Sequence, residues 1–140
     1  MKAVLDSVVF LRAAINPGSR WGRVLSESGS SYEVIVSPPI VAEILEVLTR
    51  SELRVKYPRI DRALLERVLP LVLTARVVEP AETLNVSRDP TADKFFECAV
   101  EGRADYIVSE DRDILDVGEY RGVNTVTAAE FLELLSGRAR

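Results

Sequence analysis

Histidine is absent from this chain of 140 residues, and cysteine occurs once, at Cys98. Zinc prefers nitrogen and sulfur ligands, so an ordinary zinc site is excluded, and a lone cysteine excludes an internal disulfide. Cys98 lies in sequence among Phe95, Phe96 and Ala99, which favours buried packing over reactivity. The acidic side chains are therefore the only plausible catalytic set.

Long apolar runs are also missing, although 47% of the residues are hydrophobic. A membrane span requires roughly 18 consecutive apolar residues, and the N-terminus leads directly into strand-like sequence without the pattern of a signal peptide. We therefore expect a cytoplasmic protein with no membrane segment. The length suits one well-buried core, so a single domain over residues 1–140 is expected.

Basic charge is limited, because 18 basic and 22 acidic residues leave a formal net charge of −4. This balance argues against a protein whose whole surface attracts nucleic acid. Local basic clusters remain, and they are mostly arginine, which suits bidentate contacts with phosphate. A solvated helix face explains such clusters equally well. The candidate RNA contacts are Arg12, Arg20, Arg23, Arg50, Arg54 and Lys56.

Short apolar runs alternate with helical patterns along the chain, which is typical of an α/β domain with a mainly parallel sheet. The expected strands cover residues 2–6, 32–36, 75–78, 104–108 and 123–126. The expected helices cover residues 8–15, 20–28, 39–49, 61–74, 91–102 and 128–136.

Several helix starts have recognisable signals. Ser37 and Asp89 each precede a proline, and their side chains can accept hydrogen bonds in the first turn of the helix. Thr127 and Glu130 fit a capping box, so Glu130 is left out of the candidate site. Residues 16–19 form a turn signal that divides the first helical stretch in two.

Four carboxylates occur where these elements begin or end. Asp6 ends the first expected strand, Asp111 follows the fourth, and Asp93 lies in the first turn of a helix. Glu43 falls at the edge of an apolar helix face. Ligands of open α/β sheets bind at the carboxyl ends of the strands, so these acids can face one crevice. Carboxylates alone suit a hard cation, Mg²⁺ or Mn²⁺.

Each acid also has an ordinary structural explanation. Asp93 could complement a helix dipole, Asp111 could cap a helix, and Glu43 could be a solvated helix residue. Asp6 is harder to explain in this way, because apolar residues flank it. Clustered carboxylates repel one another unless a cation neutralises them, so a metal is the physical reason for such a cluster. One or two ions there would support in-line attack of water on a phosphodiester.

Four segments in this order and spacing carry a resemblance to a known family: Val4–Ser7, Ser37–Ile44, Ser87–Phe95 and Ala104–Asp113. Over essentially its whole length, the chain is similar to PIN-domain ribonucleases, including VapC-type toxins of prokaryotic toxin–antitoxin modules. The resemblance implies a three-layer α/β/α fold with a mainly parallel central sheet of about five strands. It also implies cleavage of single-stranded RNA with Mg²⁺ or Mn²⁺, a homodimer and a cognate antitoxin.

The resemblance assigns roles to individual residues. Ser7 and Ser109 match positions where the family usually has a small hydroxyl residue that supports the acidic site. Val8 departs from the family pattern, in which a polar residue, often asparagine, follows the hydroxyl residue. The side chain of valine can hydrogen-bond neither a carboxylate nor a water. The catalytic and metal-binding acids implied by the resemblance are Asp6, Glu43, Asp93 and Asp111, with Asp113 as a fifth metal contact.

Two other functions are alternatives. A receiver-type phospho-acceptor domain needs a lysine after a late strand, and none of Lys2, Lys56 and Lys94 has that position. The more serious alternative is an inert PIN relative that binds RNA or a protein partner without cutting. A metal-dependent RNA cleavage assay separates this alternative from the enzyme.

Overall fold

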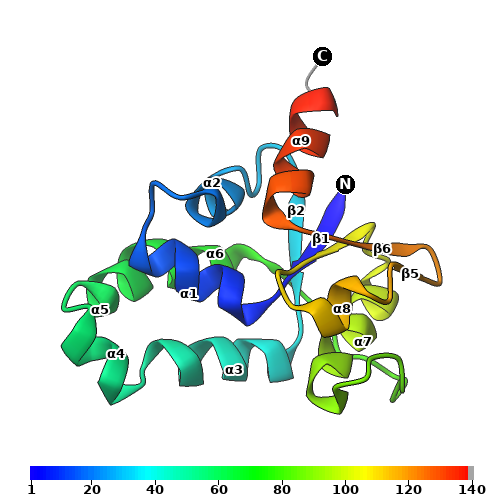
Figure 1. Ribbon diagram of the computed structural model, residues 1–140, viewed down its shortest axis with the longest axis horizontal. Helices are drawn as coiled ribbons and strands as arrows, with labels where there is room; N and C mark the ends of the chain where they lie inside the picture. Colours follow the sequence, from blue (N-terminus) through cyan, green and yellow to red (C-terminus); the bar gives the residue numbers. More distant parts are fainter. Residues whose placement is uncertain (139–140) are drawn as a thin grey trace.

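The computed structural model describes residues 1–138 and is built around a six-stranded sheet with the strand order β3-β2-β1-β4-β6-β5 (Figure 1). Neighbouring strands are parallel except for β5, which is antiparallel to β6. The mainly parallel sheet was predicted, and β5 is the added strand. The strands are Lys2–Leu5 (β1), Glu33–Val36 (β2), Arg76–Val77 (β3), Tyr106–Val108 (β4), Glu119–Tyr120 (β5) and Val123–Val126 (β6).

Helices cover both faces of the sheet (Figure 1). They are Ser7–Ile15 (α1), Arg20–Ser26 (α2), Pro38–Leu48 (α3), Ser51–Lys56 (α4), Ile60–Ala63 (α5), Leu69–Thr74 (α6), Asp93–Gly102 (α7), Arg112–Leu115 (α8) and Ala128–Arg138 (α9). A π-helical turn, Leu64–Val68 (η1), joins α5 to α6, and a 3₁₀ turn, Pro90–Ala92 (η2), leads into α7. The three-layer α/β/α arrangement is thus confirmed.

The central strands are buried on both faces because each face is covered by helices. Val4 in β1 and Ile107 in β4 are fully buried, as in most parallel sheets. Helix α7 packs against β1, β2 and β4, and its last residue, Gly102, allows a close approach. A Cβ atom at Gly102 would lie 2.7 Å from Cγ2 of Ile35 in β2. This packing fixes the position of α7 relative to the carboxyl ends of the strands.

Most of the predicted helix starts are confirmed. The backbone amide of Thr127 donates to Glu130 Oε1 at 2.9 Å, and the Glu130 amide donates to Thr127 Oγ1 at 3.1 Å. Asp89 caps η2 by accepting from the Thr91 amide at 3.0 Å. The capping role predicted for Ser37 was wrong: its hydroxyl makes no cap hydrogen bond. The first two helical residues after Ser37 are prolines, which have no N–H to donate.

Cys98 is fully buried in the core, as its neighbours predicted. Burial raises the pKa of its thiol to about 12, which leaves little reactive thiolate at neutral pH. Within residues 1–138, every helix is too short or too polar to cross a membrane.

A segment without helix or strand, residues 78–89, connects β3 to η2 and is held to α7 by acidic side chains. The acids are four residues apart on α7, so they share one face of the helix. We call their contacts the carboxylate ladder. It consists of Asp93 Oδ1 with the backbone amides of Val86 (3.1 Å) and Ser87 (2.8 Å), Glu97 Oε2 with that of Leu84 (2.9 Å), and Glu101 Oε1 with that of Ala81 (2.9 Å).

Candidate active site

A cavity of about 430 Å³ opens where β1 and β4 end, next to the start of α1. Because β1 and β4 are parallel neighbours, the residues that follow them meet at one edge of the sheet. Asp6 follows β1, and Ser109 follows β4. The acidic residues lining the cavity are Asp6, Glu43, Asp89, Glu110 and Asp111. Three of the four acids predicted to be catalytic therefore share this cavity.

Asp6 is the most buried acid of the cavity, with 5% of its surface exposed. Its Oδ2 accepts from Ser109 Oγ at 2.7 Å, and its Oδ1 accepts from the Val8 amide at 3.1 Å. Ser109 Oγ in turn accepts from the Asp111 backbone amide at 2.9 Å, so Ser109 links the Asp6 carboxylate to the backbone of Asp111.

The pKa of the Asp6 carboxyl is raised above its ordinary value, chiefly by burial. Hydrogen bonds from Ser109 and Val8 lower this pKa, and the negative charges of Glu43 and Asp111 raise it further. Ionisation of Asp6 is therefore less favourable in the protein alone than in water. A bound cation would remove this unfavourable interaction.

Glu43 reaches the cavity from α3 and is held from two sides. Its Oε2 accepts a short hydrogen bond from Ser7 Oγ, and its Oε1 accepts from Lys94 Nζ at 2.8 Å. Lys94 also donates to the carbonyl of Thr91. Ser7 thus supports the acidic site in the way that the resemblance implies, and Lys94 is an additional contact.

Asp89, Asp111 and Asp113 form a second grouping at the same edge. One carboxylate oxygen from each lies within 4.8 Å of the others, close enough to hold a metal ion. Asp111 also caps α8 by accepting from the Asp113 amide at 2.9 Å. The guanidinium of Arg88 lies 3.0 Å from Asp113, so one positive charge already offsets this group.

Two acids of the cavity were not predicted as site residues. Asp89 was given only a capping role, and Glu110 was not selected. Their positions in the sequence could have indicated a role in the site, because both residues lie within the segments that resemble the PIN family. Glu110 Oε1 also accepts from Trp21 Nε1 at 3.1 Å, which connects the cavity to α2.

Asp93 lies apart from the other predicted acids. It is 6% exposed, begins α7, and does not line the cavity. Its Oδ1 accepts the two amides of the carboxylate ladder. A structural role is therefore evident, and a metal-binding role for its other oxygen stays a prediction.

Only two of the six predicted RNA contacts line the cavity, Arg12 and Arg50. The guanidinium of Arg12 lies 4.7 Å from the centre of the Trp21 ring. Arg50 makes two hydrogen bonds to Glu46, at 3.0 and 2.9 Å. Outside the cavity lining are Arg20, Arg23, Arg54 and Lys56.

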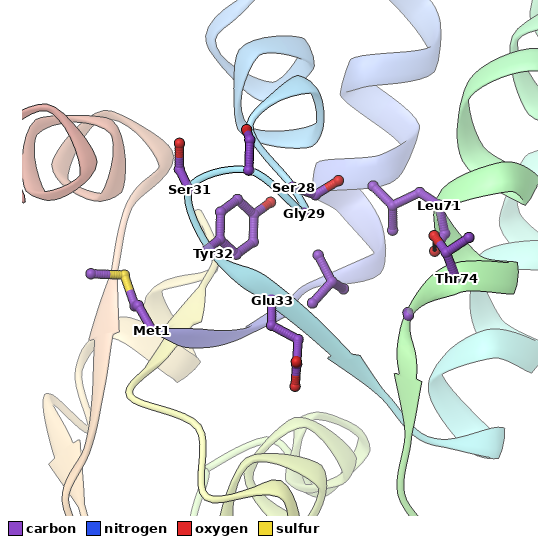
Figure 2. Close-up of a pocket in the computed structure, with 11 residues that line it drawn as sticks. Met1, Ser28, Gly29, Ser31, Tyr32, Glu33, Leu71 and Thr74 are labelled. Carbon is purple, nitrogen blue, oxygen red and sulfur yellow. Dashed lines mark hydrogen bonds between the residues drawn. The ribbon is translucent and has the colours of Figure 1, made fainter. Parts of the chain in front are cut away.

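A different cavity, of about 450 Å³, lies near the amino ends of β1 and β2 (Figure 2). Tyr32 and several hydroxyl side chains line it, among them Ser31 and Thr74. Glu33 is its one acidic residue among the described ones, and Glu33 faces Arg76 at 3.8 Å. This cavity lacks a cluster of metal ligands, so the candidate active site is the acidic cavity.

The donors at the acidic cavity are carboxylate oxygens supported by hydroxyl groups. Such oxygen donors suit a hard divalent cation of the Mg²⁺ or Mn²⁺ type, so the residues fit the metal that the resemblance implies. Asp6 and Asp111 would hold it, because both line the cavity and the negative charge of Asp111 acts on the Asp6 carboxyl.

Comparisons with known proteins bear on the family and the fold of the chain. An uncharacterized protein of Methanocaldococcus jannaschii is 30% identical over an alignment of 145 positions, and the alignment covers 95% of this chain and 90% of that protein. The crystal structure of VapBC2 from Rickettsia felis bound to a DNA fragment from their promoter matches with a TM-score of 0.59 and 10% identity. That match covers 91% of this chain and 98% of the other, and shows the fold alone. Because the model of the PIN domain family matches residues 2–113, the chain belongs to the PIN domain family.

Proposed function

We propose that this protein is a metal-dependent endoribonuclease that hydrolyses phosphodiester bonds of single-stranded RNA. The observation that carries the proposal is the meeting of Asp6, Glu43 and Asp111 in one cavity, with Asp6 buried. Membership of the PIN family supports a nuclease. A divalent cation would supply a Lewis acid that offsets phosphate charge and lowers the pKa of a water.

The chain's own residues would perform the remaining tasks. Glu43, oriented by Ser7, would accept a proton from the attacking water inside the cavity. Arg12 and Arg50 at the cavity would contact the phosphates that flank the scissile bond.

RNA cleavage should require Mg²⁺ or Mn²⁺ and should leave 5′-phosphate and 3′-hydroxyl ends. The reason is that the chain has no histidine pair to activate a ribose 2′-hydroxyl. End-group analysis of products, with and without chelator, checks this prediction. Cyclic 2′,3′-phosphates or full activity in excess chelator would contradict the mechanism, and purified protein that cuts nothing under any metal would favour the inert relative.

Val8→Asn should lower the Mg²⁺ concentration for half-maximal cleavage on the order of 10-fold, since it restores a polar group beside the site. Val8 lines the cavity and is 39% exposed, so the added amide meets solvent and should not disturb the core. The measurement is a Mg²⁺ titration of cleavage with melting temperatures in parallel. Val55→Asn, at an 84% exposed position on α4, is the matched control. An unchanged Mg²⁺ requirement in folded Val8→Asn would mean that Val8 is not a functional defect.

We also propose a cognate antitoxin that inserts arginine into the metal-free cavity. The likeness to VapBC2 and the resemblance to VapC-type toxins support a partner of this kind. A guanidinium can pair with two carboxylate oxygens and would relieve the repulsion around Asp6. Binding of the partner should therefore weaken as Mg²⁺ increases, which a titration at several Mg²⁺ concentrations measures. A partner indifferent to both Mg²⁺ and Asp6→Asn would bind elsewhere. The homodimer and the cytoplasmic location stay predictions.

A further inference from the structure

The ion pair between Lys94 and Glu43 is more buried than the other ion pairs in the described part of the chain. Lys94 Nζ lies 2.8 Å from Glu43 Oε1, and the two side chains are 21% and 31% exposed. In each of the other ion pairs among residues 1–138, both side chains are at least 38% exposed. Solvent screens those exposed pairs strongly, and it screens the pair of Lys94 and Glu43 much less.

The contacts of Lys94 restrict the positions that the Glu43 carboxylate can adopt. Lys94 is anchored by a second hydrogen bond to the Thr91 carbonyl, at the turn that precedes α7. Glu43 therefore has Oε1 occupied by the ammonium group and Oε2 occupied by the Ser7 hydroxyl. Ser7 Oγ also lies 3.4 Å from Asp6 Oδ1, so Glu43 is connected to Asp6 through a hydroxyl group.

We propose that Lys94 is a positioning residue that keeps Glu43 out of direct metal coordination. Glu43 then remains available to hydrogen-bond and deprotonate the attacking water. This inference rests on the proposed function and adds to it, because it divides the acids by task. Asp6 and Asp111 would hold the cation, and Lys94 would keep Glu43 available for the water.

The proposal predicts two effects of opposite sign when the ammonium group is removed. The positive charge of Lys94 repels a divalent cation nearby, and its loss also frees Glu43 to coordinate. Metal binding should therefore become tighter. The catalytic rate should fall, because Glu43 loses the contact that orients it. If Lys94 had a purely structural role, its removal would lower both the metal affinity and the catalytic rate, or neither.

The test compares Lys94→Met with the wild-type protein in Mn²⁺ binding and in RNA cleavage at saturating Mn²⁺. Binding is measured by calorimetry and by fluorescence of Trp21, the one tryptophan, whose Nε1 bonds to Glu110 at the cavity. We expect Mn²⁺ to bind on the order of 10-fold more tightly in Lys94→Met. Cleavage should fall on the order of 10- to 100-fold.

Three further variants make the result specific. Lys94→Arg keeps the charge and should retain wild-type Mn²⁺ affinity. Lys2→Met removes the same charge from the amino end of β1, outside the cavity lining, and should not change Mn²⁺ affinity. In the Glu43→Gln background, Lys94→Met should change cleavage little, because the group that it positions is already lost.

Wild-type Mn²⁺ affinity or wild-type cleavage in folded Lys94→Met would overturn the proposal while leaving the nuclease intact. If melting shows that Lys94→Met does not fold, Lys94→Gln provides the same comparison. A wild-type protein that neither binds Mn²⁺ nor cuts RNA would instead overturn the proposed function, and this inference with it.

Discussion

Asp6→Asn should reduce RNA cleavage on the order of 1,000-fold, because it removes the buried charge on which the proposed metal binding depends. The same change should raise the melting temperature of the metal-free protein. Asparagine keeps an acceptor for the Val8 amide, and the Ser109 hydroxyl can rotate to accept from its side-chain amide. The variant is thus expected to fold normally and lose its activity.

The expected gain in stability follows from the pKa of Asp6, which burial raises above its ordinary value of 3.8. A carboxyl whose pKa is higher in the folded state than in the unfolded state favours folding while it is protonated. This contribution is complete below the unfolded pKa and is lost as pH rises through the folded pKa. Near neutral pH the ionised carboxylate therefore opposes folding, and asparagine removes that cost.

Melting temperatures in chelator, measured from acidic to neutral pH, check the stability of Asp6→Asn. The difference between variant and wild type should grow as pH rises. Asp105→Asn is a matched control, because Asp105 is exposed and accepts from the Lys2 amide at the opposite end of β4. An Asp6→Asn protein that is less stable than wild type at neutral pH, or that still cuts RNA, would contradict the assigned role.

Asp93→Ala should lower the free energy of unfolding by about 2–4 kcal/mol, since two backbone amides lose their acceptor. Asp93→Asn keeps an acceptor oxygen for the two amides, so it should lower the free energy of unfolding much less. If Asp93 also binds metal, both variants should reduce cleavage on the order of 100-fold or more. Urea denaturation and a cleavage assay of the two variants separate the structural role from the catalytic role.

Glu97 provides the control for Asp93, because it accepts one amide in the same carboxylate ladder and does not line the cavity. Glu97→Ala should lower stability by about 1 kcal/mol and leave cleavage unchanged. If Asp93→Asn is fully active, Asp93 belongs to the scaffold and the metal is held by the other acids.

Periodicity predicted much of the framework, because each central strand is a short apolar run and each packed helix has an apolar face. Because ligands of parallel sheets bind at the carboxyl ends of the strands, the sequence also predicts that Asp6 and Asp111 lie at one edge of the sheet. Shorter or more polar elements escaped prediction. β5 has two residues, and α4 has no buried residue, so neither carries a hydrophobic period.

The side-chain contacts were beyond prediction for another reason. Which oxygen of Asp93 faces the segment 78–89, and which acid Lys94 reaches, depend on how separate elements pack. Local sequence contains no information on those distances. Asp89 shows the same limit: its capping role was visible from the following proline, whereas its approach to Asp111 and Asp113 required the fold.

The carboxylate ladder has a consequence for how the chain can vary in length. Surface connections normally tolerate inserted or deleted residues. Between Ala81 and Ser87, however, four amides bind acids that are spaced one turn apart along α7, so one added residue would put the later of these amides out of register. Any such insertion would displace the amides of Val86 and Ser87 from Asp93. Asp93 begins α7 beside the active-site cavity, so the disturbance would reach the site. Insertions should therefore be accepted before Ala81 and rejected between Ala81 and Ser87.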